Sequence, residues 1–160
     1  MAEPLALRAD PRWQRALELD AQGQALSAEA TYAGLLREHA GEPALLRRMA
    51  RLAMMRGDAA RAASLLRSCR RGGDSDDSIA IELSHALAES GQLEAAEQEL
   101  EALVQREPDH ALGWLLLGRL RELGGDSLGA LQAWLQAVVQ ARQAGRWFDE
   151  ATTPRAWAPL

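Results

Sequence analysis

Residues 114–134 read WLLLGRLRELGGDSLGALQAW and contain the pattern that decides the fold. Four kinds of residue in this stretch also occur three times earlier in the chain, each time at an interval of 34 residues. They are a small residue (Ala16, Ala50, Ser84 and Gly118), a glycine (Gly23, Gly57, Gly91 and Gly125), an alanine (Ala28, Ala62, Ala96 and Ala130) and a large apolar residue (Tyr32, Leu66, Leu100 and Trp134). A fixed period of this length is typical of proteins built from one supersecondary unit per repeat.

Each repeat is predicted to be a pair of antiparallel helices. The glycine is expected at the turn between them, where a residue without Cβ is least strained. The small residues mark the close approach of the two helices, and the large apolar residue fills the space between one pair and the next. Because one pair cannot bury its apolar face alone, the copies must stack in a row.

The fourth copy resembles the tetratricopeptide repeat family. Trp114 to Gly118 gives the family's W-x-x-L-G, followed by Gly125, Ala130 and Trp134, and Pro108 matches the proline between repeats. The resemblance covers about residues 9–144, although Arg121 replaces the usual tyrosine and the first two copies lack the early tryptophan. It implies an all-α fold, a right-handed α-solenoid of four helix-turn-helix repeats.

The expected organisation is a flexible N-terminus over 1–9, four repeats over 10–144, and a C-terminal cap or linker over 145–160. The repeats fall near 10–42, 43–76, 77–110 and 111–144. The helices are expected near 11–22, 26–39, 43–56, 59–71, 77–90, 93–106, 110–123 and 127–144. Aspartates are expected to cap several of them at Asp10, Asp58, Asp76, Asp109 and Asp126.

Composition narrows the function classes. The 160 residues carry a formal net charge of −5, which argues against general nucleic-acid binding. All 18 basic residues are arginine, a usage that fits a GC-rich bacterial gene. We expect no signal peptide, no membrane span and no internal disulfide at the lone Cys69, and so a cytoplasmic protein with that thiol buried in the core.

No catalytic or cofactor motif is found in the sequence. His39, His85 and His110 lack metal-ligand partners at short spacing, and no phosphate loop or nucleophile elbow occurs. The acidic pair Glu97 and Glu101 is interpreted as a solvated helix face. We therefore expect no enzyme activity, no metal and no cofactor in these residues.

The resemblance implies a partner-binding groove, because the first helix of each tetratricopeptide repeat lines the concave surface. The predicted groove residues are Trp13, Leu17, Arg47, Arg51, Met54, Ile81, His85, Leu115 and Arg119. Leu17, Arg51, His85 and Arg119 are 34 residues apart and should form one line along it. Such a line suits a protein or peptide with acidic groups and an apolar anchor. The alternative is ordinary solvation, with Arg51 paired to Glu82 or Glu89.

One familiar partner is disfavoured. Chaperone-binding family members use a clamp of two lysines and asparagines for a C-terminal carboxylate. The matching positions here are Trp13, Leu17, Arg51, Ser78 and Glu82, so an Hsp70 or Hsp90 tail is not expected to bind.

The tail suggests two further alternatives. Residues 145–154 resemble the junction between repeats and oxygenase domain in bacterial aspartyl/asparaginyl β-hydroxylase-like proteins. On that interpretation the chain is a non-catalytic arm, with the iron-binding domain beyond Leu160. The other alternative is a homo-oligomer formed by self-association near Trp147 and Trp157.

Overall fold

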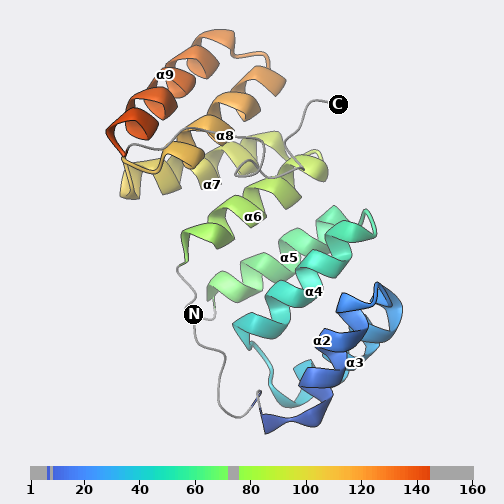
Figure 1. The fold of residues 1–160 in the computed structure, drawn as a ribbon. Coiled ribbons are helices and arrows are strands. Elements are labelled where there is room, and N and C mark those ends of the chain that lie inside the picture. Colours follow the sequence, from blue (N-terminus) through green and yellow to red (C-terminus); the bar gives the residue numbers. More distant parts are fainter. Residues whose placement is uncertain (1–6, 8, 72–75, 145–160) are drawn as a thin grey trace. The chain divides into compact units, whose positions relative to one another are not determined.

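The computed structural model describes residues 7, 9–71 and 76–144. All regular secondary structure in these residues is α-helical, and successive helices form antiparallel pairs (Figure 1). The chain divides into two compact units, 1–75 and 76–160. The helices are α2 (Pro11–Ala21), α3 (Ala25–Glu38), α4 (Pro43–Met55), α5 (Ala59–Arg71), α6 (Asp77–Glu89), α7 (Leu93–Arg106), α8 (Ala111–Leu123) and α9 (Ser127–Gln143).

These bounds confirm the predicted helices to within one residue at each end. Side-chain caps mark where several of these helices begin. The Asp10, Asp76 and Asp126 carboxylates accept backbone N–H bonds at the first turns of α2, α6 and α9. Asp58 accepts the Arg61 N–H at 3.1 Å.

The expected cap at Asp109 is wrong. His110 is the N-cap of α8, and its Nδ1 accepts the Gly113 N–H at 2.9 Å. Since α8 begins one residue later than expected, the imidazole rather than the carboxylate reaches that donor.

The turn within each pair is made by the periodic glycine. Gly23, Gly57, Gly91 and Gly125 have φ between 73° and 86°, a left-handed conformation that strains other L-residues. This confirms the role predicted for the glycine that recurs every 34 residues.

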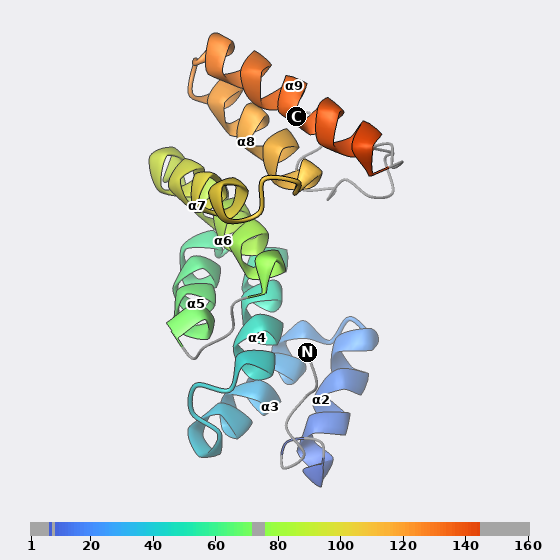
Figure 2. The ribbon, with the colours of Figure 1, turned by 90° about the vertical axis from the view of Figure 1, so that its left-hand side faces the viewer.

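In the first unit α2 packs on α3 and α4 on α5, and α3 also packs on α4 (Figure 2). Trp13 and Tyr32 lie at its centre, with their ring centroids 5.6 Å apart. Both are fully buried within one apolar cluster that extends into α4 through Leu45 and Leu52. The Cys69 thiol is also buried, as predicted.

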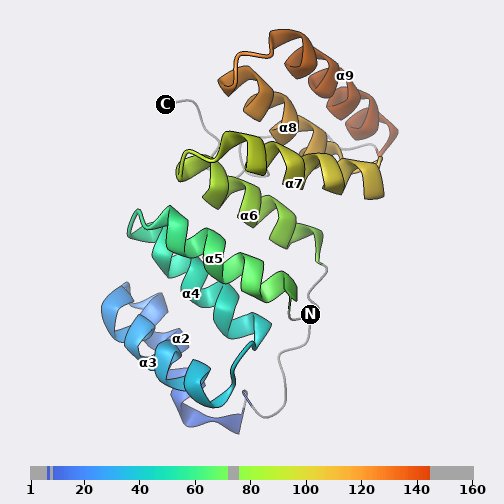
Figure 3. The same cartoon turned by 180° about the vertical axis from the view of Figure 1, so that it is seen from behind.

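The second unit repeats this arrangement: α6 packs on α7, α8 on α9, and α7 on α8 (Figure 3). The small-residue column is buried in both units, at Ala16, Ala50, Ser84 and Gly118. The Ser84 hydroxyl donates to the Ile81 carbonyl at 2.8 Å, so the polar member of this column is satisfied within its own helix. None of the described helices has the length and apolar character needed to cross a membrane.

Candidate functional site

The first helix of each pair presents the side chains predicted to meet a partner, with one exception. Trp13 is completely buried against Tyr32, so it belongs to the core and cannot contact a partner. Its apolar area is used to join α2 to α3. The prediction that Trp13 lines a groove is therefore corrected.

In the first unit, Leu17, Arg47 and Met54 are half-buried and Arg51 is exposed. The Arg51 guanidinium is held by Asp20 of α2, and Arg48 lies 3.7 Å from the same carboxylate. The alternative pairing of Arg51 with Glu82 or Glu89, which belong to the second unit, stays a prediction. Arg51 links the two helical pairs of its own unit, so part of its charge is already neutralised.

In the second unit, Ile81, His85, Leu115 and Arg119 are all half-buried. Ile81 and His85 are four residues apart on α6, as Leu115 and Arg119 are on α8, so each helix places an apolar side chain beside a polar one. Desolvation lowers the pKa of His85 despite the opposing effect of Glu89, whose carboxylate lies 3.7 Å from Nε2. His85 is therefore mainly neutral at pH 7.

Two arginines of α8 differ sharply in their surroundings. The Arg121 Nε donates to Glu97 at 2.7 Å and its terminal nitrogen to Glu101 at 2.5 Å, and the hydrogen bond to Glu97 is the main cause of its raised pKa. Arg119 makes no ion pair with any residue that the structure describes. The interpretation of Glu97 and Glu101 as a solvated face is thus corrected, because both anchor α7 to α8.

A cavity of about 440 Å³ opens beside this ion pair, between α7, α8 and α9. Its lining residues are Glu101, Val104, Gln105, Trp114, Leu117, Arg121, Gln132, Ala133 and Gln136. The apolar members give it a floor suited to an aliphatic or aromatic side chain, and the glutamines can hydrogen-bond a backbone. Sequence reasoning missed the cavity because its walls come from three separate helices.

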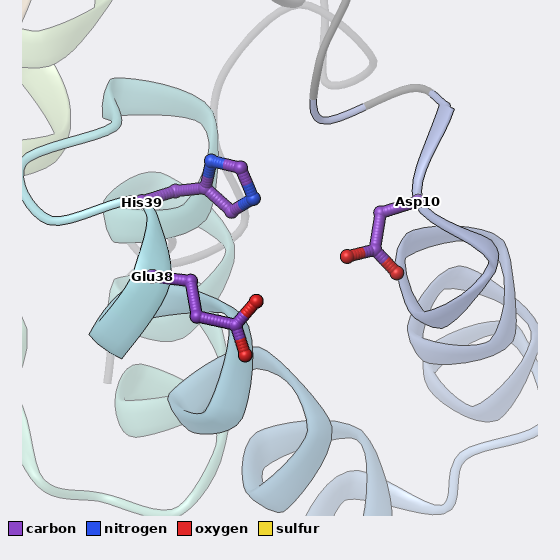
Figure 4. Close-up of side chains that lie close together, drawn as sticks. All are labelled: Asp10, Glu38 and His39. Atoms are coloured by element: carbon purple, nitrogen blue, oxygen red, sulfur yellow. The ribbon is translucent and has the colours of Figure 1, made fainter.

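Asp10, Glu38 and His39 converge where α2 begins and α3 ends (Figure 4). One ligand atom of each lies within 4.8 Å of the others, a grouping that could hold a metal ion. However, the Arg12 guanidinium already binds both carboxylates at 2.6 Å and lowers the pKa of each. The cluster is therefore explained as an ion-pair network between α2 and α3.

Part of the chain is similar in sequence to known proteins. Residues 53–120 match the family profile described as Tetratricopeptide repeat. The TPR repeat-containing protein PA0015 of Pseudomonas aeruginosa is 36% identical over 63 residues, or 39% of this chain. The match spans 60% of the length of that relative.

Two solved structures share the fold. MamA 41-end from Desulfovibrio magneticus RS-1 has a TM-score of 0.74 at 18% identity, over 89% of this chain and 79% of that one. The MamA RS-1 ArsTM double mutant has a TM-score of 0.75 at 16% identity, over 84% of this chain and 75% of that one. At such identities the likeness concerns the all-helical repeat fold alone.

Proposed function

Because residues 53–120 match the tetratricopeptide repeat family and the helical pairs agree with that fold, we propose that the chain is a scaffold that binds a segment of another protein on the first helices of its repeats. Repeats of this kind present extended binding surfaces and need no catalytic group. The chain is accordingly an interaction module and not an enzyme.

The main support for the proposal is that Arg119 is half-buried and has no carboxylate partner among the described residues. A half-buried guanidinium is partly desolvated, and it gains more than an exposed one from a carboxylate. Arg119 has no carboxylate partner among the described residues, whereas Arg121 on the same helix has two. A carboxylate of a bound segment would supply the missing partner.

Leu115 and the α6 pair define the rest of the partner. Leu115 lies one turn before Arg119 and is half-buried, so it can contact an apolar side chain next to the bound carboxylate. His85 and Ile81 repeat this pairing on α6, with a neutral imidazole that can both donate and accept a hydrogen bond. The proposed partner is an acidic segment with an apolar anchor.

The first unit is proposed to contribute less than the second to binding the carboxylates of the partner. Arg51 is already held by Asp20, so a ligand carboxylate would have to compete with that ion pair. Leu17, Met54 and Arg47 remain proposed contacts through their exposed parts. Arg119 is thus the principal cation of the proposed site.

Selection from a random peptide library displayed on phage tests the proposal. We expect wild-type protein to enrich peptides that contain Asp or Glu next to a large apolar residue, and Arg119→Ala to lose that enrichment. Arg37→Ala, which removes an exposed arginine from α3, is the matched control and should select the same peptides as wild type. If the Arg119→Ala variant enriched acidic peptides as strongly as wild type, the proposed binding site could not lie on α8.

We also propose a cytoplasmic location, which the buried thiol of Cys69 supports because free cysteines persist in reducing compartments. The predicted oxygenase junction lies in residues 145–154, outside those that the structure describes. It stays a prediction.

A further inference from the structure

The outward face of α9 is apolar and exposed. Leu128, Leu131, Leu135 and Val138 are 69%, 56%, 67% and 53% exposed. Their spacing of three, four and three residues places all four on one face of the helix, here called the α9 seam. Contiguous exposed apolar patches of this kind mark interaction surfaces.

The 34-residue period shows what normally covers this face. The positions equivalent to Leu131, Leu135 and Val138 are Glu97, Glu101 and Val104 of α7. In α7 those two glutamates bind Arg121 of α8, and Val104 is buried. The α9 seam therefore occupies the positions at which one helical pair receives another.

The composition of α9 indicates that its covering element is apolar. Arg142 is the only charged residue among residues 127–143, whereas the equivalent helix α7 carries four glutamates and an arginine. A seam without charges can pack against an identical seam without like-charge repulsion.

We propose that the α9 seam is the contact surface of a homodimer, in which a second copy of the chain packs its own α9 antiparallel to the first. The spacing three-four-three is the same in both directions. An antiparallel pair therefore places Leu128 opposite Val138 of the second copy, and Leu131 opposite its Leu135. Such self-complementarity is what a two-fold interface requires.

Charge favours the same orientation. Asp126 lies at the beginning of α9 and Arg142 at its end. Antiparallel packing brings each Arg142 toward Asp126 of the other copy, whereas parallel packing would place the two Arg142 guanidiniums together. The end charges thus select one of the two ways of pairing the seams.

The size of the seam sets the strength of the dimer. Seventeen helical residues extend for roughly 25 Å, which is short for a stable interface of about 800 Å² on each partner. The structure therefore points to a weak dimer that forms in the micromolar range or above.

Sedimentation velocity of the full chain over about 5–500 µM tests the proposal, in the concentration range of a weak dimer. We expect a monomer–dimer equilibrium that Leu131→Glu/Leu135→Glu abolishes, with unchanged helicity by circular dichroism. Leu26→Glu/Met55→Glu adds the same charge at two exposed apolar residues of the first unit and is expected to leave the dimer intact. A chain that stays monomeric throughout, as it would if residues 145–160 cover the seam, overturns the proposal.

Disulfide trapping then tests the orientation, in a Cys69→Ala background. Leu128→Cys and Val138→Cys chains should form a covalent dimer when mixed and little when each is oxidised alone. In the antiparallel pair, two copies of the same cysteine lie ten residues apart along the helices, about 15 Å, which exceeds disulfide reach. Rapid trapping of each variant with itself would show parallel packing and contradict the proposed interface.

Discussion

The indole ring of Trp134 lies directly against the backbone of Gly118, across the contact between α8 and α9. A Cβ at position 118 would lie 2.5 Å from the Trp134 Nε1 and 3.0 Å from the Ala130 carbonyl oxygen. The absence of a side chain at Gly118 is therefore what lets the two helices approach so closely.

Gly118→Ala is expected to lower the free energy of unfolding by about 1–3 kcal/mol, because the added methyl group forces the indole or the helix to move. Chemical denaturation measures the change. Gly34→Ala is the matched control: Gly34 is also helical, and a Cβ there meets nothing within 4 Å. That variant should gain about 0.5–1 kcal/mol from helix propensity. A Gly118→Ala protein as stable as wild type would contradict the packing described.

Arg121→Gln is expected to destabilise the second unit by about 1–2 kcal/mol, because it leaves Glu97 and Glu101 without their common partner. Arg119→Gln removes a guanidinium from the same helix and should change stability little. Urea denaturation of both variants separates the structural arginine from the proposed binding arginine. Equal losses of stability would refute that distinction.

His85 is expected to make the protein less stable in mild acid. Desolvation lowers its pKa in the folded state, so below about pH 6.5 the unfolded chain binds more protons at this residue than the folded one. The stability that His85 contributes to the folded protein is therefore fully present above about pH 6.5. It declines as the pH falls toward the pKa of His85 in the folded state. The difference in unfolding free energy between wild type and His85→Gln, measured from pH 7.5 to 5, should shrink in that direction. A difference independent of pH would exclude this role.

Glu29 is expected to contribute stability that is lost at lower pH. Burial alone would raise the pKa of its carboxyl, but hydrogen bonds from Arg61 and Arg56 lower it below the usual value. Stability from this group is thus present above about pH 4.5 and disappears as the pH falls through the folded pKa. Subtracting the Glu29→Gln unfolding curve from that of wild type between pH 6 and 3 isolates the effect, and a constant difference would disprove it.

The helices and much of the core could be predicted from the sequence, because the residues that recur every 34 positions are those that a particular local backbone or packing geometry requires. Gly57 and its equivalents need a left-handed backbone, and Ala62 and its equivalents face a neighbouring helix in every copy. Residue type at these positions is dictated by the repeat itself. For that reason four copies, even degenerate ones, predicted helix ends to within one residue.

The side-chain contacts between helices could not be predicted in this way. Arg121 departs from the family pattern, but its binding of Glu97 and Glu101 depends on how α7 crosses α8. The position of Trp13 on α2 predicts a surface residue, because spacing along a helix does not reveal how deeply a large side chain inserts. The proximity of Asp10 to His39 likewise follows from the antiparallel packing of α2 and α3.

Within each unit, every helix packs mainly on its neighbours along the chain, and this has a consequence for biosynthesis. Contacting residues are close in sequence, and proteins with such contacts fold in microseconds to milliseconds. At the ribosome's rate of about 5–20 residues per second, a new 34-residue repeat emerges in roughly 2–7 s. Within each unit the second repeat therefore has ample time to dock on the first, and each unit can fold while translation continues.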